Sequence, residues 1–332
     1  NTNWYDELFR NGVSTTHNLS ISGGGEKYTY YTSLSYTRNA GLLKNNDYDR
    51  YNITANLSMN PNQKVKLDFG ASMSYQYSKS PALNNINPFT YAYFANPYES
   101  PYNTDGSYRA DETYYSLGEY NNNKTSRKTV PDSGFNIMRE MNETSSRTKN
   151  VNTTVRTGID SIISKLRFVG LASFTYSTNR LKEIYNSDTK AALDNRLSVD
   201  GLSQKEYASI LQRNIDNESY MVRGHFAYDD QFGNDHSISL IAGAELRGSK
   251  SNSLYSKRYG YDAITGNTIT PLPSTTEGIG YAQLKEYLAA LDASTGETWN
   301  EQRFASFYAS ADYYYKNKYV LNASFRTDGS SN

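Results

Sequence analysis

The sequence predicts an all-β protein, an antiparallel transmembrane β-barrel, and three observations support this prediction. Apolar and polar residues alternate along several segments, and short and long connections alternate between those segments. The chain is polar, with a mean hydropathy of −0.76, although it contains 32 Tyr and 12 Phe, which favour strands. A sheet with lipid on one side and water on the other reconciles these properties, because every second side chain is apolar while its neighbours stay polar.

Period-two alternation is clearest in three consecutive segments, residues 27–38, 50–59 and 65–76. In the third segment, polar residues separate the apolar ones, which are Val65, Leu67, Phe69, Ala71, Met73 and Tyr75. A helix would instead repeat its apolar positions every three or four residues. Each segment therefore predicts a strand, and the third is about as long as a tilted strand needs to be to cross a bilayer.

The same alternation predicts seven further strands, which makes ten in all. They are expected at residues 15–23, 147–160, 165–180, 218–230, 236–252, 303–315 and 318–326. Aromatic residues gather near the strand ends, as they do in the girdles where transmembrane barrels meet lipid headgroups. We expect such a position for Tyr28, Tyr75, Tyr77, Phe174, Tyr176, Tyr313 and Tyr315.

The connections between these strands alternate in length. Short links are predicted at residues 23–26, 60–63, 161–164, 231–235 and 316–318, and longer loops at residues 39–47, 79–146, 181–217 and 253–302. Transmembrane barrels have short periplasmic turns and long extracellular loops, so the first strand should run inward and both chain ends should lie outside. Apolar residues three and four positions apart predict short helices at residues 203–213 and 281–291.

The composition excludes several classes of function. The 34 basic and 34 acidic residues give zero net charge, so no overall field attracts nucleic acid. The chain contains no Cys, which excludes disulfides and Cys-based metal sites. No run of about 18 to 20 apolar residues predicts a membrane-spanning helix. We expect no enzyme, because no nucleophile, base and orienting group occur together in one strand or loop.

Metal and cofactor sites are not predicted. The three histidines, His17, His225 and His236, lie in or beside different strands, without a second ligand at metal-binding spacing. We expect His17 at the aqueous rim or in the lumen. Calcium is imaginable at one short link, but the oxygen ligands there lack the regular spacing of a calcium-binding loop. These residues are Asp229, Asp230, Asn234 and Asp235.

Several stretches of the chain resemble one known family, in the same order along the sequence. They are WYDELFR at residues 4–10, HNLSISGG at 17–24, YYTSLSY at 30–36, NAGLL at 39–43, YDRYN at 48–52 and YVLNASFRTDGSS at 319–331. These stretches are similar to the barrel of the SusC/RagA group of TonB-dependent transporters. One departure is Thr327, where the family usually has a second Arg.

The resemblance implies a fragment of a 22-stranded barrel whose lumen is filled by a plug. Residues 1–332 would form part of that one barrel domain and supply its second to eleventh strands. An open sheet would expose unpaired edges to lipid, so we expect the chain to be a piece of a longer protein. The missing parts would be a carboxypeptidase-regulatory-like extension, the TonB box, the plug, the first strand and the later half of the barrel.

The resemblance also implies active import of a large solute, a glycan before a peptide, across the bacterial outer membrane. TonB would drive import through the plug, and a SusD-like surface lipoprotein would close over the extracellular mouth. The sequence leaves open a peptide importer of the same family, a barrel-anchored adhesin or structural protein, and an outer-membrane hydrolase. No nucleic acid and no cofactor are expected to bind.

Two groups of residues are candidates for contact with the plug or the solute. Polar strand residues should face the lumen, where packing on the plug is favoured over ligand contact; they are Arg156, Asp160, Arg223, Glu245, Arg247, Asp312 and Arg326. Six aromatic residues occupy the loop at residues 88–102. Packing of this loop on itself or on the lid protein is favoured, and stacking of sugar rings is the alternative. That alternative assigns ligand contact to Tyr91, Tyr93, Phe94, Tyr98, Tyr102 and Asn103.

Overall fold

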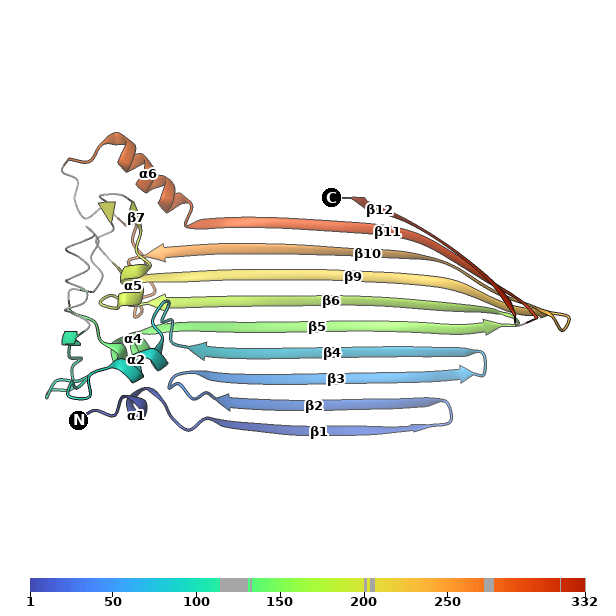
Figure 1. The fold of residues 1–332 in the computed structure, drawn as a ribbon, viewed down its shortest axis with the longest axis horizontal. Coiled ribbons are helices and arrows are strands. Elements are labelled where there is room, and N and C mark those ends of the chain that lie inside the picture. Colours follow the sequence, from blue (N-terminus) through green and yellow to red (C-terminus); the bar gives the residue numbers. More distant parts are fainter. Residues whose placement is uncertain are drawn as a thin grey trace.

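Ten strands form one antiparallel sheet in the computed structural model of the chain (Figure 1). The structure describes residues 1–113, 131, 133–199, 202–203, 207–271, 278–316 and 318–331. In their order across the sheet, the strands are β1 (Val13–Gly25), β2 (Tyr28–Ala40), β3 (Asp47–Asn62), β4 (Val65–Ser80), β5 (Thr144–Ile163), β6 (Leu166–Tyr185), β9 (Ser209–Phe232), β10 (His236–Tyr259), β11 (Thr295–Tyr315) and β12 (Tyr319–Ser331). A separate two-stranded sheet pairs β7 (Ser198–Val199) with β8 (Leu202–Ser203). The predicted all-β fold with antiparallel strands is confirmed.

Most strands continue beyond the residues where the alternation is visible. β9 begins at Ser209 although the sequence predicts its start at residue 218, and β11 begins at Thr295 although 303 is predicted. Near the long loops the two faces of a strand no longer meet lipid and water, and residues such as Ile210 are buried among the loops instead. The apolar series therefore fades there, while the ladder of backbone hydrogen bonds continues.

The two predicted loop helices have different outcomes. The helix predicted at residues 281–291 is confirmed, since α6 spans Tyr281–Asp292. The helix predicted at residues 203–213 is wrong, because Ser209 already pairs with Tyr185 of β6 and Tyr259 of β10. Residues 204–206 of that segment lie outside the described part of the chain. Pairing with two neighbouring strands overrides the weak helical pattern.

The pairing register places the apolar series of neighbouring strands on one face. Leu34 of β2 faces Ile53 of β3, which in turn faces Met73 of β4, and Thr54 faces Ser72 in the alternate positions. Directly opposite residues of an antiparallel pair point to the same side of the sheet. We call the side with the apolar series the outer face and the opposite side the inner face.

Aromatic side chains form a row on the outer face near the long loops. The rings of Tyr36 and Tyr51 lie 4.8 Å apart, and those of Tyr51 and Tyr75 lie 6.2 Å apart. His17 of β1 faces Tyr36 and extends this row, with the ring centroids 6.4 Å apart. The expectation that His17 lies in the lumen is therefore wrong, and the alternative position at the aqueous rim stays a prediction. Its position opposite Tyr36 turns the imidazole to the outer face, beside the tyrosine row.

The opposite end of the outer face carries a second aromatic group. His236 Nδ1 lies 2.6 Å from the hydroxyl oxygen of Tyr313, and the rings of His236 and Tyr315 lie 5.1 Å apart. The ring of Tyr319 stacks beside Tyr315, at 6.3 Å. Two aromatic bands thus border the apolar part of this face, as in membrane-spanning barrels.

The long connections and the helices lie at one end of the sheet, and the short turns lie at the other end (Figure 1). Among the described residues, the other helices with given bounds are α1 (Trp4–Leu8), α2 (Pro88–Phe94), α4 (Ile137–Glu143) and α5 (Lys190–Asp194). At the other end, Gly233 in the β9–β10 turn has a φ of 62°. Glycine adopts this left-handed conformation without the steric penalty of a Cβ atom, which suits a tight turn. We call the two ends the loop end and the turn end.

The buried hydrophobic side chains of the described residues gather at the loop end. Leu8, Phe135 and Ile137 have no exposed surface and belong to one cluster with neighbours from α1, α2 and α4. The middle of the sheet is a single layer with no such core. The loops therefore have their own hydrophobic core, which lies at the loop end of the sheet. Among the described residues, no helix has the length and apolar content to cross a membrane.

Candidate functional site

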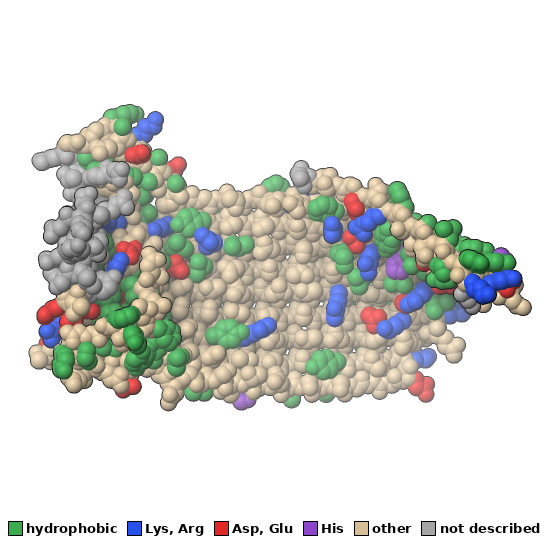
Figure 2. Space-filling model, viewed as in Figure 1, with side chains coloured by type: hydrophobic (Ala, Val, Ile, Leu, Met, Phe, Trp, Pro, Cys, Tyr) green, Lys and Arg blue, Asp and Glu red, His purple; other side chains and the backbone are tan. Residues whose placement is uncertain are grey.

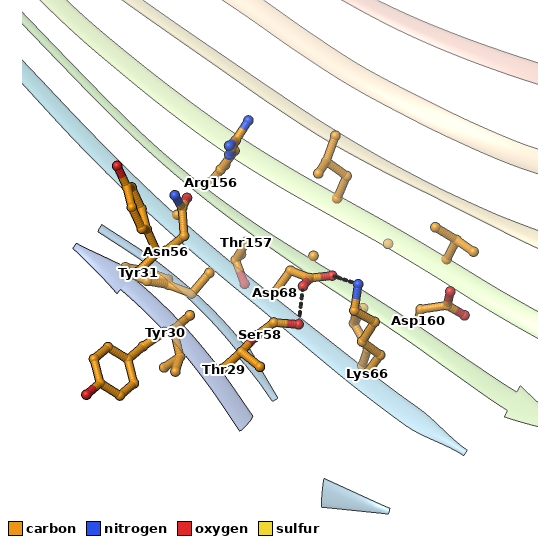
Figure 3. Close-up of a pocket in the computed structure, with 18 of the residues that line it drawn as sticks. Thr29, Tyr30, Tyr31, Asn56, Ser58, Lys66, Asp68, Arg156, Thr157 and Asp160 are labelled. Carbon is orange, nitrogen blue, oxygen red and sulfur yellow. Dashed lines mark hydrogen bonds and ion pairs between the residues drawn. The ribbon is translucent and has the colours of Figure 1, made fainter. Parts of the chain in front are cut away.

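A hollow of about 680 Å³ opens on the inner face of the sheet (Figure 3). Six strands, β2 to β6 and β9, line it with side chains that include Tyr31, Asn56, Asp68, Arg156 and Arg223. These residues occupy the polar alternate positions of their strands. The antiparallel register therefore brings them together from segments that are far apart in the sequence.

Several charged groups in and around the hollow are held by neighbours within the wall. Asp68 accepts a hydrogen bond of 2.7 Å from Ser58 Oγ and lies 3.1 Å from Lys66 Nζ, as the dashed lines in Figure 3 show. Nε of Arg167 donates a hydrogen bond of 2.9 Å to Asp160. Charge-assisted hydrogen bonds of this kind fix the side chains in place.

Two guanidinium groups of the hollow differ from these pairs. Within the described part of the chain, neither Arg156 nor Arg223 forms an ion pair, although both line the hollow. The side chain of Arg156 passes over Gly70 of β4, where an added Cβ atom would lie only 2.9 Å from Arg156 Nε. Glycine at this position thus gives the guanidinium space, and the arrangement offers two cationic donors to a group in the lumen.

All seven residues that the sequence assigns to the lumen share the inner face. They are Arg156, Asp160, Arg223, Glu245, Arg247, Asp312 and Arg326. Arg326 Nη2 lies 3.8 Å from Glu245 Oε1, and the guanidinium carbon of Arg247 lies 4.7 Å from the centre of the Phe304 ring. Asp312 accepts a hydrogen bond from Asn322. What these side chains contact inside a complete barrel stays a prediction.

The charged side chains are unevenly distributed over the face that Figure 2 shows. Polar side chains and backbone occupy most of its middle, and Lys, Arg, Asp and Glu gather toward the turn end (Figure 2). Hydrophobic side chains are prominent at the loop end. Charged side chains of the inner face therefore concentrate toward the turn end.

Of the six predicted ligand residues in the aromatic loop around α2, some contact the rest of the loop and others are exposed to solvent. Tyr91 is internal, since its ring lies 5.3 Å from that of Trp4 and its hydroxyl donates a 2.6 Å hydrogen bond to Asp111. Tyr102 packs against the loop core. Asn103 Nδ2 donates to the hydroxyl oxygen of Ser107 at 2.9 Å. These three predicted ligand contacts thus serve the loop itself in this structure.

The other three predicted ligand residues are open to solvent. Tyr93, Phe94 and Tyr98 are 73%, 75% and 81% exposed. The helix that carries the first two is fixed at its start, because the side chain of Asn87 accepts hydrogen bonds from the backbone N–H groups of Phe89 and Thr90. The exposed rings therefore stand on an anchored backbone.

A groove of about 310 Å³ lies beside Phe94. Asn85 and Asn96 contribute amide groups, and Asp111 and Thr113 contribute oxygen atoms from a later part of the loop. Sequence reasoning did not select Asp111 or Thr113 for this site. No local pattern identifies them, because only the folding of the loop brings them next to α2. The groove combines an aromatic face with polar hydrogen-bonding groups, as binding sites for polar organic molecules do.

The acidic residues considered for calcium have other neighbours. Asp230 pairs with Lys165 and accepts a 2.7 Å hydrogen bond from the hydroxyl of Tyr228. Asp235 Oδ2 lies 3.6 Å from Lys316 Nζ. Among the described residues, no group of three or more His, Asp or Glu side chains could hold a metal ion.

Sequence comparisons give relatives of one kind. No family model matches the chain. TonB-dependent receptor P26 of Formosa agariphila is 24% identical over 339 aligned residues, which cover 100% of this chain and 29% of P26. TonB-dependent receptor SusC of Bacteroides thetaiotaomicron is 41% identical over 58 residues, 18% of this chain and 6% of SusC.

Comparison of folds gives a solved structure of the same kind. The RagAB peptide importer in its closed-closed state matches 99% of this chain with a TM-score of 0.66 and 14% sequence identity, over 33% of that chain. The resemblance to SusC/RagA-like TonB-dependent transporters is confirmed. This SusC/RagA-like chain spans 29% of the length of P26, and its open ten-stranded sheet corresponds to part of a transporter barrel.

The predicted cellular location follows from the same relatives. TonB-dependent receptors are outer-membrane proteins, so the prediction of a bacterial outer-membrane location for this SusC/RagA-like chain is confirmed. The matched proteins are receptors and transporters rather than enzymes.

Proposed function

We propose that this chain forms part of the barrel wall and extracellular mouth of a TonB-dependent importer of large solutes. The observation that carries the proposal is the two-faced sheet of ten strands, which shares its fold with the RagAB importer over 99% of the chain. An apolar outer face suits lipid, and a polar inner face suits a wet lumen. Energy would come from TonB acting on a plug, which residues outside this chain would supply.

For the solute, we propose a glycan. Sugar rings present apolar C–H faces that stack on aromatic side chains, while their hydroxyl groups bond to amides and carboxylates. The groove beside Phe94 offers both, since the ring is 75% exposed and Asn85 and Asn96 line the same space. A peptide is the second candidate, because RagAB is a peptide importer by name.

A SusD-like lipoprotein is the partner that we propose for the loop end. Aromatic residues are frequent anchors in protein interfaces, and Tyr93 and Tyr98 are exposed outside the groove lining. We assign these two tyrosines to the lid and Phe94 to the solute. Hydrophobic contact with a lid would also cover the apolar surface that α2 leaves open.

Uptake by intact cells that produce the full-length protein tests this assignment. Phe94→Ala combined with Asn85→Ala should lower accumulation of a labelled oligosaccharide about tenfold, since the lost stacking and hydrogen bond correspond to about 1.4 kcal/mol or more. Tyr281→Ala is the matched control, because Tyr281 is 83% exposed but lies in another loop. Barrel abundance and co-purification of the lid protein should not change in either variant.

Other outcomes of the same assay decide between the alternatives. Loss of uptake of labelled peptides but not oligosaccharides would favour the peptide importer. Loss of the lid protein together with uptake would assign Phe94 to the interface. Binding of solute without accumulation, both before and after the proton gradient is collapsed, would favour the adhesin and contradict import.

A further inference from the structure

A basic groove lies on the outer face, immediately beyond the tyrosine row on the side of the long loops. It has a volume of about 540 Å³ and is bordered by Tyr75 and Tyr77 of β4. The basic side chains that line it are Arg147, Lys149, Arg180 and Lys182. The pairing register puts all four on the outer face, because they share the strand parity of Tyr77, which faces Lys149.

Like charges stand directly opposite one another in this groove. Arg147 of β5 faces Lys79 of β4 on one side and Lys182 of β6 on the other. In the adjacent row, Lys149 faces Arg180. Like charges at directly opposite positions destabilise an antiparallel pair, so this arrangement favours the binding of an anion.

Acidic residues of the chain neutralise part of this charge. Asp47 of β3 faces Lys79, although its ion pair is with Arg10. Arg180 Nη2 lies 2.9 Å from Asp216 Oδ1, which is an ion pair between strands β6 and β9. Within the described residues, Lys79, Arg147, Lys149 and Lys182 form no ion pair. Glu143 shares a neighbouring pocket with Lys79 and Arg147 but does not approach either of them closely enough to form one. Arg147 and Lys149 are exposed.

The position of the groove along the membrane normal determines which anions can reach it. Aromatic rows mark the level of the lipid headgroups in outer-membrane barrels. Tyr75 belongs to the tyrosine row, and Arg147 and Lys149 follow on β5 within four residues of Val151, which faces Tyr75. With the long loops outside, the groove opens at the headgroups of the outer leaflet. The outer leaflet of a bacterial outer membrane contains glycolipids that carry phosphate groups.

We propose that this basic groove binds the phosphate group of an outer-leaflet glycolipid of the lipid A class. Arg presents a planar donor fork that matches phosphate oxygens, and Lys adds compact positive charge around it. Tyr75 borders the groove on the membrane side, where the acyl chains of the lipid begin, and Tyr77 lies level with Lys149. The site is independent of solute import, because it faces lipid rather than the lumen.

Titration of lipid A into the detergent-solubilised full-length protein, followed by native mass spectrometry, tests the proposal. The wild type should retain lipid A and should release its dephosphorylated form. Arg147→Gln combined with Lys182→Gln should weaken retention of lipid A about tenfold or more. The matched control is Arg50→Gln with Arg213→Gln, which removes two exposed charges from the inner face and should leave retention unchanged.

A second measurement separates loss of the site from loss of the fold. Without lipid, the Arg147→Gln and Lys182→Gln variant should unfold at the wild-type temperature or above it, because the substitution removes opposed like charges. Equal retention of lipid A and its dephosphorylated form would overturn the proposal. Displacement of lipid A by an equal concentration of inorganic phosphate would assign the groove to a free anion instead.

Discussion

Glu140 Oε2 accepts a hydrogen bond of 3.0 Å from the backbone N–H of Ala191, and the N–H of Lys190 donates to the other carboxylate oxygen. Glu140 belongs to α4, in the loop between β4 and β5, whereas Ala191 belongs to α5, in the loop between β6 and β9. The side chain is completely buried. One carboxylate therefore joins two of the long loops at the loop end.

The junction at Glu140 should respond to pH. Burial raises the pKa of Glu140 to about 7 from 4.5, against the lowering effect of the two backbone hydrogen bonds and of Lys190. The pKa of Glu140 is thus higher when its loop is docked on the loop of Ala191 than when the two loops are apart. The docked arrangement is therefore most stable below about pH 4.5. It weakens as the pH rises toward 7, by about 3 kcal/mol at most. Glu140→Gln should remove this pH dependence.

Hydrogen exchange of the backbone amides around residues 190 and 191 measures the opening of this junction, after correction for the intrinsic pH dependence of exchange. Glu286→Gln, an exposed position on α6, is the control and should leave the protection profile as it is in the wild type. An unchanged pH dependence in Glu140→Gln would show that another group controls docking.

Arginine substitutions should distinguish the two faces of β4. Phe69 lies on the outer face and Ser72 on the inner face. Phe69→Arg should cost about 2 to 4 kcal/mol near the middle of the bilayer, and Ser72→Arg should cost much less because it enters the wet lumen. The fraction of assembled barrel in outer membranes reports the difference. Equal losses at both positions would contradict the assignment of the faces.

Cysteine labelling should reveal which end of the sheet lies outside the cell. Ile264 is 95% exposed in the connection between β10 and β11, and Asn62 lies at the turn end of β3. In an otherwise Cys-free full-length protein, Ile264→Cys should react with an impermeant thiol reagent on whole cells, whereas Asn62→Cys should react only after lysis. The opposite labelling pattern would show that the barrel has the reverse orientation in the membrane.

Loss of the loop core should loosen the mouth and spare the sheet. Phe135 has no exposed surface, so Phe135→Ala should leave a cavity that costs about 3 to 5 kcal/mol in the stability of the loop. Limited proteolysis on whole cells should then cut this loop faster at unchanged barrel abundance. Tyr281→Ala, at an 83% exposed ring on α6, is the comparison that should behave as wild type.

Period-two alternation was sufficient to predict the strands whose middle crosses the membrane. Val65 to Tyr75 shows why, since lipid on one side and water on the other impose opposite preferences on successive residues. The alternation does not predict the first nine residues of β9, because they lie among the long loops, where the contrast between lipid and water is absent.

The basic groove and the groove beside Phe94 bring together residues that are distant in the sequence, so no local sequence pattern predicts them. Arg147 and Lys182 lie in different strands, and only the register of β5 and β6 places them opposite each other. The groove beside Phe94 likewise needs Asp111, which reaches α2 through the path of the loop. The sequence alone does not distinguish Tyr91 from Phe94, because both are aromatic residues of the same loop. The packing of Tyr91 on Trp4 separates them in the folded loop.

In the proposed importer, the hydrophobic core at the loop end would also affect how fast and how selectively the mouth captures a solute. Loops that are ordered before an encounter lose little conformational entropy on binding, so more of the contact energy appears as affinity. Phe135 and Ile137 hold such an ordered arrangement in the connection between β4 and β5. Selection among solutes would then depend on shape at the first encounter, with association rates set by diffusion and orientation rather than by loop closure.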